Sequence, residues 1–136
     1  MSIEYLSPDS LHKNPAFSQV VTIEGNMRTV YVGSQNAVTS SGEVIRKGDM
    51  RQQASQVFKN LEIALAVAGA RIENVIKWNV YIVQGQPLQP AFEQFQRVWG
   101  NRPNQPLVTV LFVAGLANPD YLLEIDAIAV ISENNG

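Results

Sequence analysis

The sequence predicts one α+β domain spanning residues 1–136, in which two helices pack on one face of a mixed β-sheet. Two observations lead to this fold class. Segments with strand and helix periodicity follow one another in the order β-β-β-α-β-α-β-β, and two helices are enough to cover a single sheet face. The chain has 136 residues and no cysteine, so it can bury one core and must do so without disulfides.

Short strands and turns make up the first part of the chain. Residues 3–6 form a predicted strand, and two Pro-containing turns make residues 7–16 a loop. Residues 19–23 and 29–33 are rich in β-branched and aromatic side chains, which favour strands. Because only the tripeptide Glu24-Gly25-Asn26 separates them, we expect these two strands to pair as a hairpin.

A long helix follows a Ser-, Thr- and Gly-rich loop over residues 36–48. Asp49 can cap this helix, and Gln52 three residues later completes a pair that resembles a capping box. Gly69 is a natural stop. Apolar residues recur with the spacing of one buried stripe, at Met50, Ala54, Val57, Phe58, Leu61, Ala64, Leu65 and Ala68.

A strand and a second helix come next. Residues 75–83 alternate, with a strongly apolar face that contains Trp78 and Ile82 and a second face that contains Lys77 and Asn79. Residues 84–90 carry two prolines and a glycine, which predicts a loop. The apolar residues within 91–99 have helical spacing and end before Gly100.

Two strands complete the chain. Residues 107–114 are apolar on both faces, so both faces need cover. After a turn at 117–120, residues 121–131 form the last strand, and residues 132–136 are expected to fray. Since two helices cover only one sheet face, burial of the other face against further copies of the chain is the economical solution. The sequence therefore predicts an obligate homo-oligomer.

The composition argues against several classes of protein. Ten Lys and Arg residues face twelve Asp and Glu residues, the isoelectric point is about 5.3, and no basic cluster stands out, so no nucleic-acid partner is expected. Neither a signal peptide nor an apolar run of ~18 residues is present. We therefore expect a cytoplasmic protein with no membrane partner.

Few residues suit metal or cofactor chemistry. The lack of cysteine excludes thiolate nucleophiles and cysteine-ligated zinc, and His12, the only histidine, lies in a loop where an ordinary surface role is favoured. No phosphate-binding glycine motif occurs, so no metal and no cofactor are predicted. Glu124 and Asp126 lie on the same side of the last strand, roughly 6.5–7 Å apart. They form either an acid/base pair or a solvated or salt-bridged pair.

Several segments together carry a resemblance that covers nearly the whole chain in order. They are Ala16-Phe17-Ser18-Gln19, Val30-Tyr31-Val32-Gly33-Ser34-Gln35, Gln53 with Asn60, Ala68-Gly69, Val75-Ile76-Lys77, Phe92-Glu93-Gln94-Phe95 and Leu123-Glu124-Ile125-Asp126-Ala127-Ile128-Ala129. This ordered set resembles the YjgF/RidA family of reactive intermediate deaminases. The resemblance implies a chorismate-mutase-like fold, a homotrimer with ligand clefts between subunits, and hydrolysis of enamines and imines such as 2-aminoacrylate or 2-iminobutanoate.

The resemblance also implies a set of site residues. Val108 stands where the family has an arginine that binds the substrate carboxylate, and a valine cannot imitate a guanidinium. Arg102 in the preceding loop is the alternative cation. Glu124 matches the water-positioning glutamate and is the predicted catalytic residue, with Asp126 as its competitor. The predicted ligand-binding residues are Phe17, Gly33, Ser34, Gln89, Val108, Thr109 and Glu124.

Three functional hypotheses follow. The first is a divergent Rid-family trimer that binds a small metabolite in intersubunit clefts, as a deaminase or related hydrolase of altered specificity. The second is a non-catalytic binding or scaffold trimer, and the third, less supported by the acidic composition, is an endoribonuclease. The apolar residues Phe17 and Val108 predict a cleft that favours a neutral or aromatic molecule. We also expect Glu124 to lie within reach of a pocket bounded by Phe17 and Val108.

Overall fold

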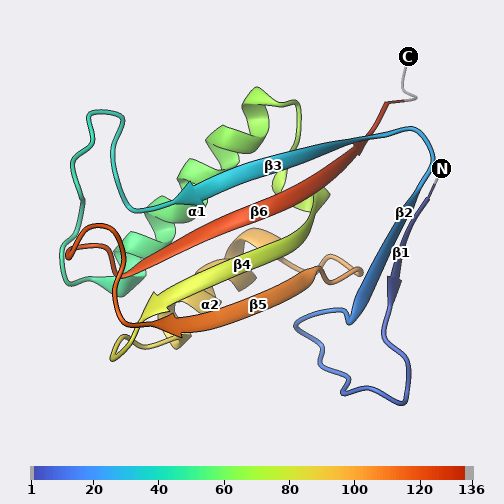
Figure 1. The fold of residues 1–136 in the computed structure, drawn as a ribbon, viewed down its shortest axis with the longest axis horizontal. Helices are drawn as coiled ribbons and strands as arrows, with labels where there is room; N and C mark the ends of the chain where they lie inside the picture. The colour runs from blue at the N-terminus through green and yellow to red at the C-terminus, as the bar shows by residue number, and fades with distance from the viewer. Residues whose placement is uncertain (1, 134–136) are drawn as a thin grey trace.

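The structure, a computed structural model, describes residues 2–133. Two helices lie on one face of a four-stranded sheet, and a two-stranded sheet stands beside it (Figure 1). The predicted arrangement of two helices on a mixed sheet is therefore confirmed. The elements are β1 (Ser2–Leu6), β2 (Val20–Glu24), β3 (Met27–Gln35), α1 (Met50–Val67), the 3₁₀ helix η1 (Ile72–Asn74), β4 (Val75–Val83), α2 (Gln89–Trp99), β5 (Leu107–Val113) and β6 (Leu123–Ser132).

The larger sheet has the strand order β3-β6-β4-β5. Its central strands β6 and β4 are antiparallel, as are β3 and β6, whereas β4 and β5 run parallel. A parallel pair needs a crossover connection, and here α2 supplies it. β5 is consequently an edge strand of the sheet, and α2 lies behind β4 and β5 in this view (Figure 1).

The expected hairpin between the second and third strands is wrong. β2 pairs with β1, and β3 pairs with β6 from Met27 opposite Ser132 to Gln35 opposite Ile125. The chain turns a corner at Gly25, whose φ is 101°, instead of folding back on itself (Figure 1). The distant pairing prevails because β6 offers ten residues with an apolar helix-facing side, whereas β2 offers five.

The helices begin and end close to the predicted positions. Asp49 caps α1 as expected, and its side chain accepts a hydrogen bond of 3.0 Å from the backbone N–H of Gln52. Most of the predicted stripe is buried, with Ala64 and the C-cap Ala68 half-buried, and the same side of α1 also contains the fully buried Gln53, which the apolar pattern did not include. α2 begins at Gln89, two residues earlier than predicted, because Pro90 is accommodated in its first turn.

The core lies between the helices and the sheet. Trp78 of β4 is at its centre, where its ring meets Phe58 of α1 and Phe95 of α2 edge to face at centroid distances of 5.7 and 6.0 Å. Trp99 stacks on Phe95 with centroids 5.9 Å apart. These four rings hold both helices on the same sheet face.

The C-terminal end is more ordered than predicted. The last strand begins at Leu123 and includes Ser132, and the backbone N–H of Glu133 donates to the Asn26 carbonyl at 3.1 Å. The Glu133 carboxylate also pairs with Arg28 Nε at 2.9 Å. The expectation of fraying is therefore wrong for residues 132 and 133, while 134–136 lie outside the described residues. Among the described residues, none of the helices combines the length and apolar character that a membrane crossing requires.

Candidate functional site

An apolar cavity of about 210 Å³ lies between α2, the N-terminal loop and the helix-facing side of β4 and β5. Every side chain that lines it is aliphatic or aromatic. Those that matter below are Phe17, Leu88, Phe92, Phe95, Val108 and Val110. The cavity therefore excludes charge from its walls and offers mainly aromatic and aliphatic contacts to a ligand.

The N-terminal loop holds Phe17 at this cavity through hydrogen bonds to the chain that enters β5. The backbone N–H of Ser18 donates to the Pro106 carbonyl at 3.0 Å, and its hydroxyl donates to the Gln105 carbonyl at 2.6 Å. Ser18 is itself buried. Phe17 is thereby fixed next to the start of β5, which brings it to the same cavity as Val108.

Strand register decides which side chains of β5 reach the cavity. Val108 lies opposite Trp78 and Val110 lies opposite Val80, and all four face the helices. Thr109, opposite Asn79, takes the other face by alternation. Of the predicted ligand-binding residues, Phe17 and Val108 are thus brought together in one cavity.

α2 forms the outer wall of the cavity. Its N-terminal turn is tied to α1 by an ion pair between Arg51 and Glu93, and Gln89 Nε2 donates to the other Glu93 oxygen at 3.4 Å. These two donors lower the pKa of Glu93, with the Arg51 hydrogen bond as the main cause. Gln89 is exposed beside Glu93 and does not line the cavity.

A polar cluster occupies the helix-free face of the sheet. Asn79 Nδ2 donates to Asp126 Oδ1 at 2.7 Å, and Asn36 Nδ2 donates to Glu124 Oε1 at 3.2 Å. The Asp126 charge raises the pKa of Tyr81, which lies directly opposite Glu124 on the neighbouring strand. Neither carboxylate forms an ion pair with another described residue, so both are held by neutral donors.

The predicted site residues therefore divide between two faces of the sheet. Glu124 and Thr109 are on the helix-free face, whereas Phe17 and Val108 are on the helix face. Gly33 and Ser34 are exposed in the bulge of β3, where the register shifts between Val32 and Gln35. Within one chain, Glu124 does not reach the cavity that Phe17 and Val108 line.

Arg102 does not supply a cation to the cavity. One guanidinium nitrogen, Nη1, donates to the Val98 carbonyl at 2.9 Å and to the Trp99 carbonyl, and the guanidinium lies 5.3 Å from the Trp99 ring centroid. These contacts direct the side chain to the C-terminal end of α2. His12 is exposed, and within residues 2–133 no group of His, Asp or Glu side chains is arranged to hold a metal ion.

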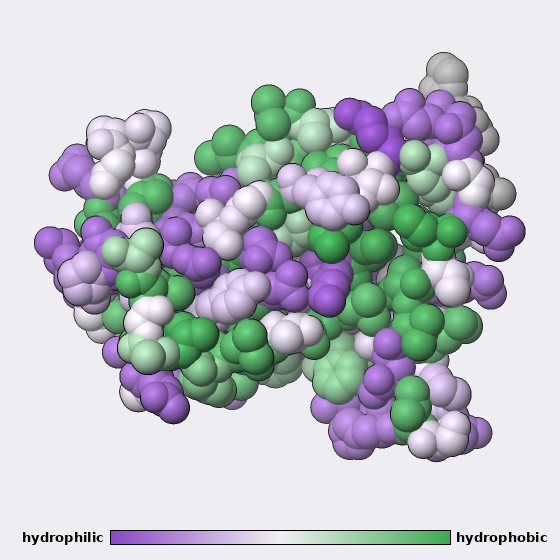
Figure 2. Space-filling view, viewed as in Figure 1, coloured by the Kyte–Doolittle hydropathy of each residue, from purple (hydrophilic) through white to green (hydrophobic). Residues whose placement is uncertain are grey.

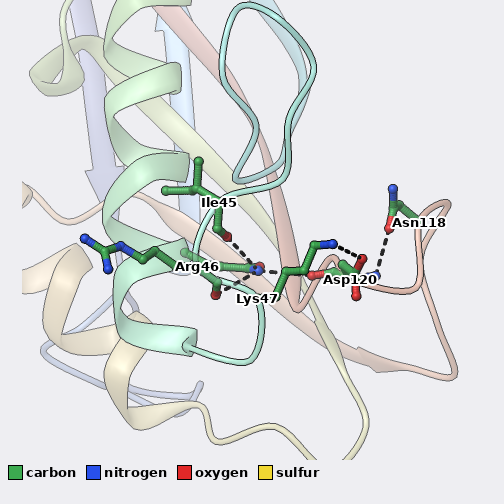
Figure 3. A network of polar contacts seen from close by, with 6 residues as sticks. Ile45, Arg46, Lys47, Asn118 and Asp120 are labelled. Atoms are coloured by element: carbon green, nitrogen blue, oxygen red, sulfur yellow. Dashed lines mark hydrogen bonds and ion pairs between the residues drawn. The ribbon is translucent and has the colours of Figure 1, made fainter.

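Two polar residues on the buried side of α1 connect the helix to the segment that carries Glu124. Gln53 Nε2 donates to the carbonyls of Asp120 and Ile45 at 3.0 and 3.2 Å, and its Oε1 accepts from the Leu122 N–H at 3.0 Å. Figure 3 shows the loop side of this network, where Lys47 pairs with Asp120 at 3.4 Å.

Asn60, two helical turns after Gln53, provides the second connection. Its Nδ2 donates to the carbonyls of Asn36 and Val38 at 2.9 and 3.0 Å, and Asn36 in turn donates to Glu124. Sequence reasoning noted both residues but gave them no role. Their signal was a polar side chain on the otherwise apolar face of a helix, because a buried amide is costly unless it is hydrogen-bonded.

Comparison with known proteins connects this geometry to a family. The family model described as endoribonuclease L-PSP matches residues 8–131. A 2-iminobutanoate/2-iminopropanoate deaminase of Rattus norvegicus is 30% identical over 115 residues, which cover 85% of this chain and 80% of the rat protein.

Solved structures agree in fold. A Rid-family protein of unknown function from Yersinia pestis has a TM-score of 0.81 at 26% identity and covers 96% of this chain and 100% of its own. E. coli TdcF with bound serine has a TM-score of 0.68 at 25% identity over 93% of this chain and 94% of its own.

Proposed function

The chain belongs to the endoribonuclease L-PSP family, also known as the YjgF/Rid family, and on this basis we propose that it binds a small, uncharged, apolar molecule in a cleft between subunits. The observation that carries the proposal is the cavity at Phe17 and Val108, whose lining consists of aliphatic and aromatic side chains and contains no charged group. An apolar ligand gains from leaving water there, whereas a carboxylate loses hydration without finding a partner.

Assembly completes the proposed cleft. The cavity volume of about 210 Å³ is below the roughly 300–1,000 Å³ of most ligand sites. Around it, Leu88, Val110 and Phe112 are 40%, 37% and 50% exposed, and the edge of β5 is unpaired. An apolar rim and a free strand edge both favour cover by another chain. We expect a homotrimer with a mass near three times 15.0 kDa; a stable monomer at micromolar concentration in light scattering would refute this.

Ligand class is tested by comparing a neutral aromatic probe, indole, with an anionic one, 2-oxobutanoate. We expect indole to raise the Tm of the wild type and 2-oxobutanoate to leave it unchanged, because only the first matches the cavity. Val108→Arg should reverse this preference by placing a guanidinium in the wall. Gln96→Arg adds the same charge on the exposed side of α2, away from the apolar cavity, and should behave as the wild type.

The outcomes separate the hypotheses. If the wild type binds 2-oxobutanoate as tightly as it binds indole, the arginine that Val108 replaces is unimportant and the proposal fails. If neither probe binds the assembled protein, the scaffold hypothesis replaces it.

Hydrolysis of imines or enamines with altered specificity is the second candidate function. The Glu124 carboxylate, held by Asn36, and the similarity to the rat deaminase favour it. Within one chain, Glu124 and the cavity lie on opposite faces of the sheet, so a neighbouring copy must bring its Glu124 to the cavity. We expect little hydrolysis of 2-aminoacrylate by the wild type and a gain in Val108→Arg.

Glu124→Gln tests this second function with Asp126→Asn as the matched control. Both variants remove one negative charge from the same face of β6, so only a specific role separates them. In the Val108→Arg background, we expect Glu124→Gln to abolish turnover of 2-aminoacrylate without changing the mass of the assembly, while Asp126→Asn retains it. Equal turnover with and without Glu124→Gln in that background would remove the case for an enzyme. Ribonuclease activity is not proposed, because the cavity lining offers no cation for a phosphate.

A further inference from the structure

A second hollow of about 360 Å³ lies away from the apolar cavity, between the C-terminal half of α1, η1 and the end of α2. Four charged side chains line it: Glu62, Arg71, Glu73 and Arg102. The rest of its lining is alanine, isoleucine and valine, including Ile72 and Val98. We call this hollow the charged groove. It shares no lining residue with the apolar cavity.

Arg102 is held in this groove before any ligand arrives. Its contacts with two carbonyls at the end of α2 and with the Trp99 ring fix the guanidinium. Its Nη2 lies 4.0 Å from Glu73 Oε1, which is too long for a hydrogen bond. A guanidinium that is positioned but not saturated loses little freedom when it binds a planar carboxylate.

The other two charges have no ionic partner within residues 2–133. Neither Arg71 nor Glu62 forms an ion pair there, yet both line the groove. The lining thus contributes two cations and two anions around an apolar floor. A ligand with one charge of either sign would meet an equal number of like charges, whereas a ligand with both charges can pair with each.

We propose that the charged groove binds a free zwitterionic amino acid with a small apolar side chain. Arg71 and Arg102 receive its carboxylate, Glu62 and Glu73 receive its ammonium group, and the side chain packs on Ile72 and Val98. The groove volume falls within the range of small-molecule sites. This inference does not depend on the function proposed for the apolar cavity.

Isothermal titration calorimetry of the assembled protein with L-valine tests this site. We expect saturable binding at millimolar concentrations and at least about tenfold weaker binding of two analogues, 3-methylbutanoate, which lacks the ammonium group, and 2-methylpropylamine, which lacks the carboxylate. Binding should weaken as ionic strength rises. Absence of saturable L-valine binding would overturn the proposal, as would equal binding of either analogue.

Variants locate the binding. Arg71→Gln and Glu62→Gln should each weaken L-valine binding by about tenfold or more, and both residues are exposed enough that the fold should tolerate them. Arg97→Gln is the matched control, since Arg97 is exposed on α2 outside the groove lining. Val108→Trp, which fills the apolar cavity without adding a charge, should leave L-valine binding unchanged. If Val108→Trp alters it and the groove variants do not, L-valine binds in the apolar cavity and the groove proposal is wrong.

Discussion

Replacing Gln53 with leucine should destabilise the protein although it leaves the size of the side chain almost unchanged. Gln53 is completely buried, and its amide serves four backbone groups of two separate segments. Leucine fills the same space, so no large cavity forms. The Leu122 N–H, which donates to Gln53 Oε1, then has no acceptor, and the Asp120 and Ile45 carbonyls lose their donor.

The magnitude follows from these contacts. A buried donor left without a partner costs about 1–3 kcal/mol, and each of the two hydrogen bonds that the NH₂ group can make contributes roughly 0.5–1.5 kcal/mol. The larger apolar surface of leucine returns about 1–2 kcal/mol. The net loss in free energy of unfolding is about 2 kcal/mol, or a fall in Tm of roughly 5–10 °C for a chain of this length.

Urea unfolding at one fixed protein concentration measures this loss, since association makes apparent stability depend on concentration. Gln52→Leu is the matched control, because Gln52 is the preceding residue on the same helix and its side chain is exposed. We expect the control to change stability by less than about 0.5 kcal/mol. If Gln53→Leu changes it no more than Gln52→Leu does, the buried amide does not hold the two segments and the reasoning fails.

Two predictions concern titration. The Asp126 charge raises the pKa of Tyr81 above 10.0, so Asp126→Asn should lower that pKa, as followed by phenolate absorbance. The contribution of the protonated Tyr81 to stability is present below pH 10 and is lost as pH rises through the raised pKa. An unchanged Tyr81 titration would contradict the contact. Arg51 lowers the pKa of Glu93 below 4.5, so Arg51→Met should raise that pKa in an NMR titration. The contribution of the ionised Glu93 to stability is present above pH 4.5 and is lost as pH falls through the lowered pKa. A Glu93 pKa that stays low in Arg51→Met would assign the shift to Gln89 instead.

Features set by neighbouring residues could be predicted from the sequence. The Asp49 cap and the α1 stripe depend on contacts three or four residues apart, and the alternation of residues 75–83 follows from strand geometry. The predicted helices and strands therefore lie near the observed ones. The hairpin predicted at Gly25 is wrong because β3 pairs with β6, a strand about a hundred residues away, instead of with the neighbouring β2. The composition of the turn carries no information about such a distant partner.

The arrangement of the candidate site depends on the register between neighbouring strands, which the sequence alone does not give. Alternation separates the two faces within β5 and within β6, but only the pairing of Trp78 with Val108 and of Asn79 with Asp126 shows that Val108 and Glu124 take opposite faces. Phe17 reached the cavity through the hydrogen bonds of Ser18 to a segment far along the chain. These are long-range contacts, so the residue types at the site were predictable and their arrangement was not.

The separation of Glu124 from the cavity yields a prediction about assembly. If catalysis uses Phe17 and Val108 of one copy and Glu124 of another, two variants that each lack one half should complement one another. A chain that carries both Val108→Arg and Glu124→Gln, and a chain that carries the cavity-blocking Val108→Trp, are each expected to lack turnover of 2-aminoacrylate. Refolding them together in equal amounts gives each cleft a one-in-two chance of the Val108→Arg cavity and a one-in-two chance of an intact Glu124. About one quarter of the clefts, and of the rate of the Val108→Arg protein, should therefore be active. The same two chains refolded apart and then mixed are the control. Failure to recover activity in mixed trimers that mass spectrometry shows to have formed would mean that no cleft combines the two halves, and Glu124 would then act, if at all, on the helix-free face of its own chain.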